Sequence, residues 1–192
     1  MIKILHIKNA KEKHLLSLSV FEGEETARYT LDERFVLENR YSSGDEITED
    51  DLSAIKARDA YIRGKLKALS LLSFADNSKA TLRMKLLRFG TDKETAERIV
   101  DEMVSLGYLN EENQIDRLVM RLACDRLFGP KKIIAQLASK GYSASDVRSA
   151  IRRLCDSGEI DFAENKRRLL EKYSVEDGDC DGENKILYKN GF

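Results

Sequence analysis

One pattern of apolar and glycine positions occurs twice in the sequence, and this repeat limits the folds that the chain can adopt. Residues 82–109 and 133–160 carry the same apolar and glycine positions at a separation of 51 residues. Corresponding pairs include Leu82 and Ile133, Leu86 and Leu137, Gly90 and Gly141, and Gly107 and Gly158. A period of about 50 residues is typical of helical repeat proteins, in which each unit is too small to bury a core alone and packs against its neighbours.

The same spacing extends toward the C-terminus and predicts a third copy. Leu71, Leu122 and Tyr173 are each 51 residues apart. Leu187 and Gly191 lie 50 residues beyond Leu137 and Gly141. We expect this copy to be incomplete, because the sequence stops before a third helix. Its apolar residues Ile186, Leu187 and Phe192 either pack back on the second repeat or stay frayed until a partner covers them. We expect fraying, since the acidic segment 176–183 offers little local stability.

Inside each complete copy, apolar residues follow helical spacing and glycines separate the segments. The middle helix is predicted to end at Gly90 or Gly141, because glycine adopts the left-handed conformation after a helix at little cost. The third helix is predicted to end at Gly107 or Gly158. Pro130 suits the first turn of a helix, where its missing N–H is not needed. Each complete copy is therefore predicted to form three short helices.

The N-terminal part has a different pattern. Residues 2–31 alternate apolar and polar positions between turn-like segments, which predicts a three-stranded antiparallel sheet. Thr30 begins a capping-box pattern, so a short helix is expected to start near Asp32. The same pattern at Thr48 is expected to begin one or two helices that fill residues 48–74.

Together these patterns predict a mainly α fold, with tandem three-helix repeats preceded by a small antiparallel β-sheet and a short helix. Two repeats are expected to be complete and the third truncated. The expected divisions are an N-terminal part at 1–47, complete repeats at 48–109 and 110–160, and an incomplete repeat at 161–192.

Composition favours a cytoplasmic protein, and a monomer is expected. The longest apolar run, residues 68–75, is far shorter than the roughly 20 residues that span a bilayer. The first residues lack the apolar core of a signal peptide. Cys124, Cys155 and Cys180 have no zinc-site spacing, so we expect reduced, structural cysteines.

The sequence offers no set of residues for catalysis, and we expect a non-enzymatic protein without cofactor or metal. Both histidines, His6 and His14, fall among the predicted N-terminal strands, and nucleotide-binding motifs are absent. Residues 177–182 resemble the start of an EF-hand loop. The twelfth position of that loop needs a glutamate, and Tyr188 stands there, so a solvated acidic linker is the better interpretation.

The two complete copies each carry a small positive net charge, unlike the segments on either side. Segments 59–109 and 110–160 each carry nine basic and seven acidic side chains, between acidic flanks. Candidate contacts for a partner or for DNA fall between the predicted core positions: Arg83, Arg88, Arg98, Arg121, Arg126, Lys131, Lys132, Arg148, Arg152 and Arg153. Lysine and arginine are mostly solvent-exposed in any protein, so each one alone is explained as well by a solvated surface. As a group they could line a groove.

Several segments together resemble the RecX regulatory proteins: ALSLLS at 68–73, LRMKLLRFG at 82–90, LGYL at 106–109, FGPKKIIAQLASKGY at 128–142 and KILYKNGF at 185–192. The N-terminal strands resemble the extension of the longer RecX members. The resemblance implies a modulator of the RecA recombinase that lies in the groove of the RecA filament on single-stranded DNA. It would limit ATP hydrolysis, strand exchange and the SOS response.

Two alternatives remain open from the sequence. The basic helices could form a direct nucleic-acid-binding module without a protein partner, or the chain could be a helical scaffold that affects neither component. Phosphate contacts alone give sequence-independent binding to bare DNA, so only the first alternative predicts such binding at physiological salt without RecA.

Overall fold

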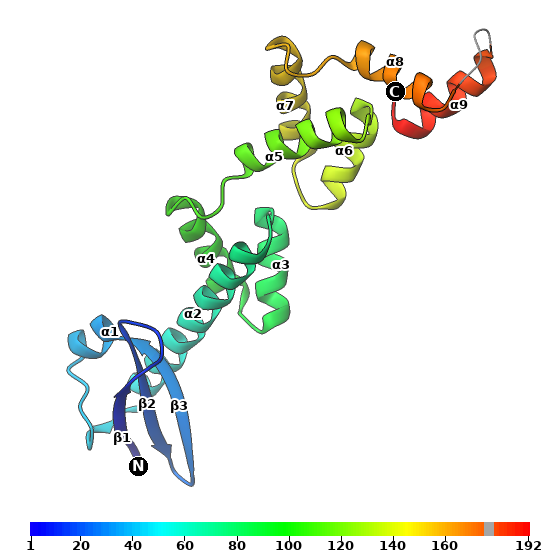
Figure 1. The fold of residues 1–192 in the computed structure, drawn as a ribbon. Helices are drawn as coiled ribbons and strands as arrows, with labels where there is room; N and C mark the ends of the chain where they lie inside the picture. Colours follow the sequence, from blue (N-terminus) through cyan, green and yellow to red (C-terminus); the bar gives the residue numbers. More distant parts are fainter. Residues whose placement is uncertain (175–178) are drawn as a thin grey trace. The chain divides into compact units, whose positions relative to one another are not determined.

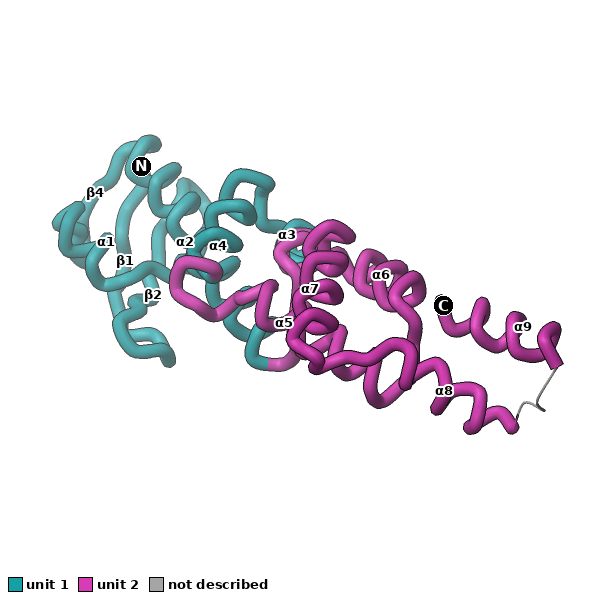
Figure 2. The backbone as a smooth tube through the Cα atoms, turned by 90° about the horizontal axis from the view of Figure 1, so that it is seen from above, with its two compact units in different colours: residues 1–73, 85–103 teal, residues 74–84, 104–192 magenta. Residues whose placement is uncertain are grey.

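The computed structural model describes residues 1–174 and 179–192, and Figure 1 shows the order of its helices and strands. The chain forms two compact units, coloured separately in Figure 2. Unit 1 contains residues 1–73 and 85–103, and unit 2 contains residues 74–84 and 104–192. The predicted mainly α architecture with a small antiparallel sheet is confirmed. The predicted boundaries between the repeats remain a prediction.

The N-terminal sheet has the three predicted antiparallel strands and one more. Its strands are β1 (Ile2–Asn9), β2 (Leu15–Glu22), β3 (Glu25–Asp32) and β4 (Glu46–Ile47), in the order β3-β2-β1-β4. The prediction missed β4 because two residues are too few to show an alternating pattern. His14 lies in the turn before β2 with a φ of 64°, not in a strand as expected.

One face of this sheet packs on helices of unit 1. Alternate residues of the three long strands, among them Ile4, Leu18, Val20 and Leu31, are fully buried. They form a core with residues of α1 (Glu33–Glu38) and α2 (Glu49–Phe74). Because side chains alternate across a strand, the predicted period of two is what places them on one face.

The first helix starts where it was predicted, but its cap is a different residue. Asp32 precedes α1, and its carboxylate accepts a hydrogen bond from the backbone N–H of Phe35 at 3.0 Å. The prediction of Thr30 as the cap is wrong. Thr30 still belongs to β3, and its N–H donates to the Asp59 carboxylate of α2 at 2.6 Å, so it cannot close the helix. The carboxylate next to the first turn takes that place.

The capping box at Thr48 is confirmed. The Thr48 hydroxyl accepts from the backbone N–H of Asp51, and the Asp51 carboxylate accepts from the backbone N–H of Thr48. These reciprocal bonds satisfy groups that a helix start leaves unpaired. The helix that follows is the single, 26-residue α2 rather than two shorter helices.

The repeated stretch forms matching pairs of helices. In the first copy these are α3 (Lys79–Phe89) and α4 (Lys93–Ser105), and in the second copy α6 (Pro130–Ser139) and α7 (Ala144–Asp156). Gly90 and Gly141 follow the two middle helices with φ values of 98° and 85°, which confirms the predicted left-handed positions. Pro130 begins α6, also as predicted.

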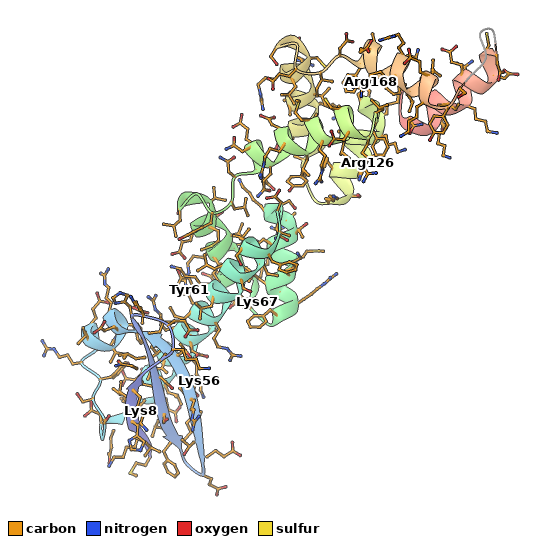
Figure 3. The ribbon with its side chains drawn as sticks, viewed as in Figure 1. Lys8, Lys56, Tyr61, Lys67, Arg126 and Arg168 are labelled. Carbon is orange, nitrogen blue, oxygen red and sulfur yellow. The ribbon has the colours of Figure 1, made fainter. Side chains whose placement is uncertain are left out.

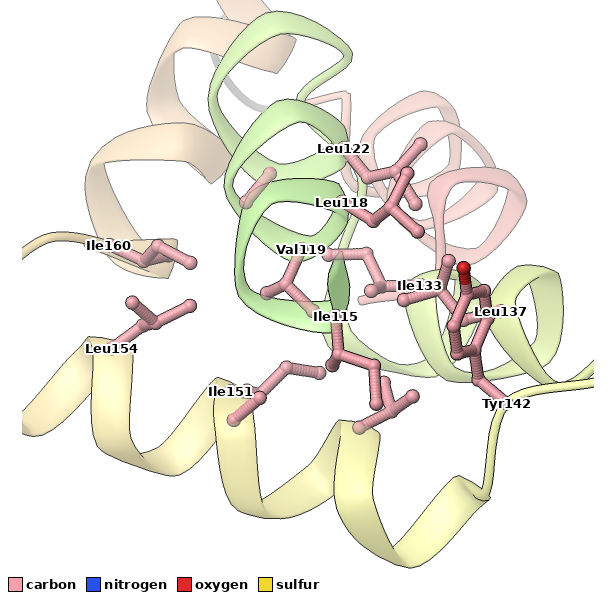
Figure 4. Packing of buried hydrophobic residues seen from close by; sticks show 13 residues of the cluster. Ile115, Leu118, Val119, Leu122, Ile133, Leu137, Tyr142, Ile151, Leu154 and Ile160 are labelled. Atoms are coloured by element: carbon pink, nitrogen blue, oxygen red, sulfur yellow. The ribbon is translucent and has the colours of Figure 1, made fainter. Parts of the chain in front are cut away.

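In unit 2, the helix before α6 does not stay α-helical to its end. It begins as α5 (Glu111–Met120) and continues as a π-helical turn, η1 (Arg121–Asp125). Residues of α5, η1, α6 and α7 form one hydrophobic cluster, shown in Figure 4. The predicted core positions Val147, Ala150, Ile151 and Leu154 are buried there, whereas Cys155 is only half-buried.

The C-terminal segment is docked, so the expectation of fraying is wrong. It consists of α8 (Phe162–Lys172) and α9 (Cys180–Asn190), and Leu187 is buried in a cluster with Leu127 and Leu169. Backbone carbonyls at the end of α9 accept hydrogen bonds from the first residues of the α6 segment. Gly129 N–H donates to Asn190 at 2.7 Å, and Lys131 N–H donates to Gly191 at 3.1 Å.

The C-terminal segment is docked because the end of α9 and the start of α6 supply hydrogen-bond partners for each other's unpaired backbone groups. The first N–H groups of a helix and the last C=O groups of another have no partners inside their own helices. When the end of α9 meets the start of α6, both sets are paired, and the opposite partial charges of the two ends attract. The apolar spacing and the acidic segment on which the expectation of fraying is based do not show how helix ends pair.

Candidate functional site

The described residues contain no arrangement that would hold a metal. Across residues 1–174 and 179–192, no group of three or more His, Cys, Asp or Glu side chains is placed so that it could hold a metal ion. Asp177 and Gly178 of the EF-hand-like segment fall outside the described residues. Asp179 lies within them and caps α9, its carboxylate accepting from the Gly182 N–H at 3.0 Å. Among the described helices, none is long and apolar enough to cross a membrane.

The predicted basic residues fall in both compact units. Eight belong to unit 2 (Arg83, Arg121, Arg126, Lys131, Lys132, Arg148, Arg152 and Arg153), and two belong to unit 1 (Arg88 and Arg98). All except the half-buried Lys132 are exposed. Exposure alone does not make a residue available to a partner, because some of these side chains are engaged inside the protein.

Arg153 is engaged in an ion pair between two helices. Its guanidinium donates to Asp116 of α5 at 2.8 Å and lies 3.5 Å from Glu112. The hydrogen bond that Arg153 donates to Asp116 is the main reason that the pKa of Arg153 is raised. By contrast, Arg148 and Arg152 on the same helix α7 form no ion pair with any residue the structure describes. The three arginines therefore do not act as one free group.

Lys132 is also committed to internal contacts. Its ammonium group donates to the Lys189 carbonyl at 3.1 Å and to Asn190 Oδ1 at 3.2 Å. It lies 3.9 Å from the centre of the Phe128 ring, a favourable cation–π position. Burial, and then the charge of Lys189, lower the pKa of Lys132. This side chain joins α6 to the end of α9.

In unit 1, Arg98 stacks on an aromatic ring. Its guanidinium carbon lies 4.2 Å from the centre of the Tyr61 ring of α2, which is labelled in Figure 3. Arg88 stands in the last turn of α3, where a positive charge interacts favourably with the helix end. Arg83 is exposed on the same helix.

Arg121 and Arg126 converge on one cleft in unit 2. The cleft has a volume of about 460 Å³ and is lined by Arg121, Leu122, Asp125, Arg126 and Gln136. Arg126 directly follows η1 and is labelled in Figure 3. Neither arginine forms an ion pair with a carboxylate in the described parts of the chain. Two of the predicted basic residues thus line the same cleft.

The sequence pattern identifies both arginines as outside the core but does not place them together. Residues five apart lie on different sides of an α-helix, which has about 3.6 residues per turn. Gln136, on the facing helix α6, and Asn165, which contacts η1, were missed altogether. Both are ordinary polar residues, and their positions in the repeat pattern do not distinguish them from solvated ones.

Comparisons with known proteins agree on one family name. No family model matches the chain. The chain is 28% identical over 144 residues to Regulatory protein RecX of Clostridioides difficile, covering 68% of each protein. It is 24% identical over 157 residues to Regulatory protein RecX of Lactobacillus gasseri, covering 80% of this chain and 56% of that protein. For Regulatory protein RecX of Streptococcus pneumoniae, identity is 26% over 180 residues, with coverages of 90% and 64%.

The matched regions thus span between about half and two-thirds of these relatives. The fold is shared with a crystal structure of regulatory protein RecX, at a TM-score of 0.72 and 20% identity, covering 100% of this chain and 95% of that one. A structure of RecX from Lactobacillus salivarius gives a TM-score of 0.58 at 22% identity, with coverages of 70% and 89%. These comparisons support the RecX family of regulatory proteins as the family that this chain resembles in sequence and fold.

Proposed function

We propose that this protein is a non-enzymatic regulator of the RecA recombinase. The observation that carries the proposal is the similarity to proteins named Regulatory protein RecX, which extends over 68% to 90% of the chain. The family resemblance implies that RecA is the target. Repeated helices such as those of unit 2 typically bind large partners rather than small molecules, which suits a protein filament.

We further propose that the protein binds in the groove of the RecA filament on single-stranded DNA. Bound there, it would limit ATP hydrolysis, strand exchange and the SOS response. The exposed basic side chains of unit 2, such as Arg121, Arg126, Arg148 and Arg152, support contact with an acidic partner or with DNA. Lys132 and Arg153 contribute less directly, because they hold helices of the protein together.

The test is the rate of ATP hydrolysis by RecA on single-stranded DNA, measured with and without this protein. We expect the rate to fall as the protein is added and the effect to saturate. As a matched comparison, the Arg148→Ala/Arg152→Ala variant should inhibit less at the same concentration. A hydrolysis rate that is independent of the protein would contradict the proposed function.

A nucleic-acid-binding module without a protein partner is the second candidate, and the cleft between Arg121 and Arg126 is the observation in its favour. The two candidates differ in their affinity for bare DNA. Each of the segments 59–109 and 110–160 carries nine basic against seven acidic side chains, and so small an excess gives weak, salt-sensitive binding to phosphates. We therefore expect tighter binding to RecA filaments than to bare strands. Equal affinities at physiological salt would favour the second candidate.

A further inference from the structure

We propose that the cleft beside η1 binds the phosphodiester backbone of single-stranded DNA, with Arg121 and Arg126 as its two anion-binding side chains. The proposal deepens the function given above and rests on it for the identity of the strand. The site is formed by the π-helical turn, so it exists only while that turn keeps its conformation.

The π turn is what places the two arginines together. A π-helix closes hydrogen bonds between residues five apart, whereas an α-helix closes them between residues four apart. Residues five apart are therefore brought over one another in a π turn, and Arg121 and Arg126 have this spacing. Both line the same cleft, together with Gln136 of α6. Single π turns in helical segments occur frequently at functional sites.

Contacts inside the protein hold the turn in this form. The Ala123 carbonyl, in the middle of η1, accepts a hydrogen bond from the side-chain amide of Asn165 at 3.1 Å, and Asn165 is buried. The Leu122 carbonyl accepts from the backbone N–H of Phe128 at 3.0 Å. A buried carbonyl without a donor would be costly, so these bonds stabilise the turn. Asn165 is thus a positioning residue for the cleft.

The charges of the cleft suit an anion with several oxygens. Elsewhere in unit 2, Arg117 pairs with Asp76 at 3.1 Å and Arg153 pairs with Asp116 at 2.8 Å. Arg121 and Arg126 make no such pair with a described residue, not even with Asp125 in the same cleft. Two guanidinium groups and one carboxylate leave a positive lining. Guanidinium donors form forked hydrogen bonds that match phosphate oxygens.

The first repeat has no counterpart of the two arginines. In the first copy, the residues 51 positions earlier than the two arginines are Ser70 and Ala75, and neither carries a charge. An arginine pair needed only for solubility would have no reason to coincide with the π turn. The coincidence in this repeat indicates a localised contact with the strand rather than a general positive surface.

The experiment measures binding of the full chain to a fluorescent oligo(dT) strand, without RecA, over a series of salt concentrations. Each phosphate contact to a single strand contributes about 0.7 to the slope of log affinity against log salt. We expect Arg121→Ala/Arg126→Ala to reduce that slope by about 1.4. The control, Lys166→Ala/Arg168→Ala, removes two exposed charges from α8 and should keep the slope of the unmodified protein.

A third variant, Arg121→Lys/Arg126→Lys, keeps the charges but not the forked donors. It should keep the slope while binding more weakly, and full affinity in this variant would overturn the assigned geometry. Equal losses of slope in the two alanine variants would show general charge attraction instead of a site. An unchanged slope in Arg121→Ala/Arg126→Ala would overturn the proposal outright.

RecA ATPase, measured in parallel, separates this inference from the proposed function. If the unmodified protein leaves the hydrolysis rate unchanged, the proposed function fails while the salt slope still tests the cleft. If Arg121→Ala/Arg126→Ala keeps its slope on DNA but loses its effect on RecA, the two arginines contact an acidic protein surface, and the DNA cleft is wrong.

Discussion

Gly141 lies against Ser78, and the two residues join the ends of two middle helices in unit 2. A Cβ atom added at Gly141 would lie only 2.7 Å from the Ser78 hydroxyl oxygen. That hydroxyl donates to the Lys140 carbonyl at 2.9 Å, and the Thr81 hydroxyl donates to the same carbonyl at 2.8 Å. The start of α3 therefore binds the end of α6, as the start of α6 binds the end of α9.

Gly141→Ala should destabilise the protein more than Gly90→Ala. Both glycines have positive φ, for which a side chain costs about 1–2 kcal/mol. A Cβ at Gly90 meets nothing within 4 Å, whereas one at Gly141 meets Ser78 and Thr81. Overpacking of this kind adds about 1–3 kcal/mol. Urea denaturation midpoints of the two variants measure this difference. Equal losses of stability would show that Ser78 and Thr81 move aside for the added methyl group at no cost in free energy.

Leu187→Ala should release the C-terminal segment from α6. Leu187 is 6% exposed, and removing such a buried side chain costs about 2–5 kcal/mol. The amide protons of Gly129 and Lys131, which are bonded to the end of α9, should then exchange faster with solvent. Tyr188→Ala is the control, because Tyr188 is 85% exposed. Fast exchange at Gly129 in the unmodified protein would contradict the docked arrangement.

Glu102→Gln should reduce the loss of stability of unit 1 in acid. Burial raises the pKa of Glu102, but hydrogen bonds from Lys65 and Tyr61 outweigh this and hold the pKa below its ordinary value of 4.5. The unfolded state therefore binds a proton at Glu102 more readily than the folded state does. The ionised Glu102 side chain thus adds to the free energy of unfolding above pH 4.5, and this stabilisation is lost as the pH falls through the folded-state pKa.

The measurement for Glu102 is the urea midpoint at neutral pH and at a pH below 4.5. The difference between the two midpoints should shrink in Glu102→Gln. It should stay unchanged in Asp101→Asn, which alters an exposed residue of the same helix. Identical acid sensitivity in Glu102→Gln and the unmodified protein would show that the contacts with Tyr61 and Lys65 do not stabilise the folded state.

Arg153→Ala should lower stability at low salt, whereas Arg152→Ala should leave it unchanged. Arg153 joins α7 to α5 through Asp116, and Arg152 has no ion pair in the described chain. The side chain of Arg153 is 48% exposed, so salt should screen the pair and remove the difference between the variants. Thermal midpoints at low and high salt measure this. A difference that persists at high salt would point to packing instead.

Most of the helices, the three long strands and the glycines between helices could be predicted from local sequence patterns. These features follow from local rules: apolar residues at helical or alternating spacing, and a backbone conformation at Gly90 and Gly141 that favours residues without a side chain. The basic residues could also be named from sequence, because the predicted core positions left them outside. Which of the basic residues lie close together in space could not be predicted from the sequence.

Which of these residues lie together depends on how the helices pack. Arg121 and Arg126 converge because α5 ends in a π turn, and that turn is held by Asn165, which lies on another helix. Arg153 is tied to Asp116, and the predicted frayed end is instead paired with α6. Each outcome depends on a polar group finding a partner far away in the sequence. Because such pairing is decided by the packing of whole helices, no local pattern of residues could reveal it.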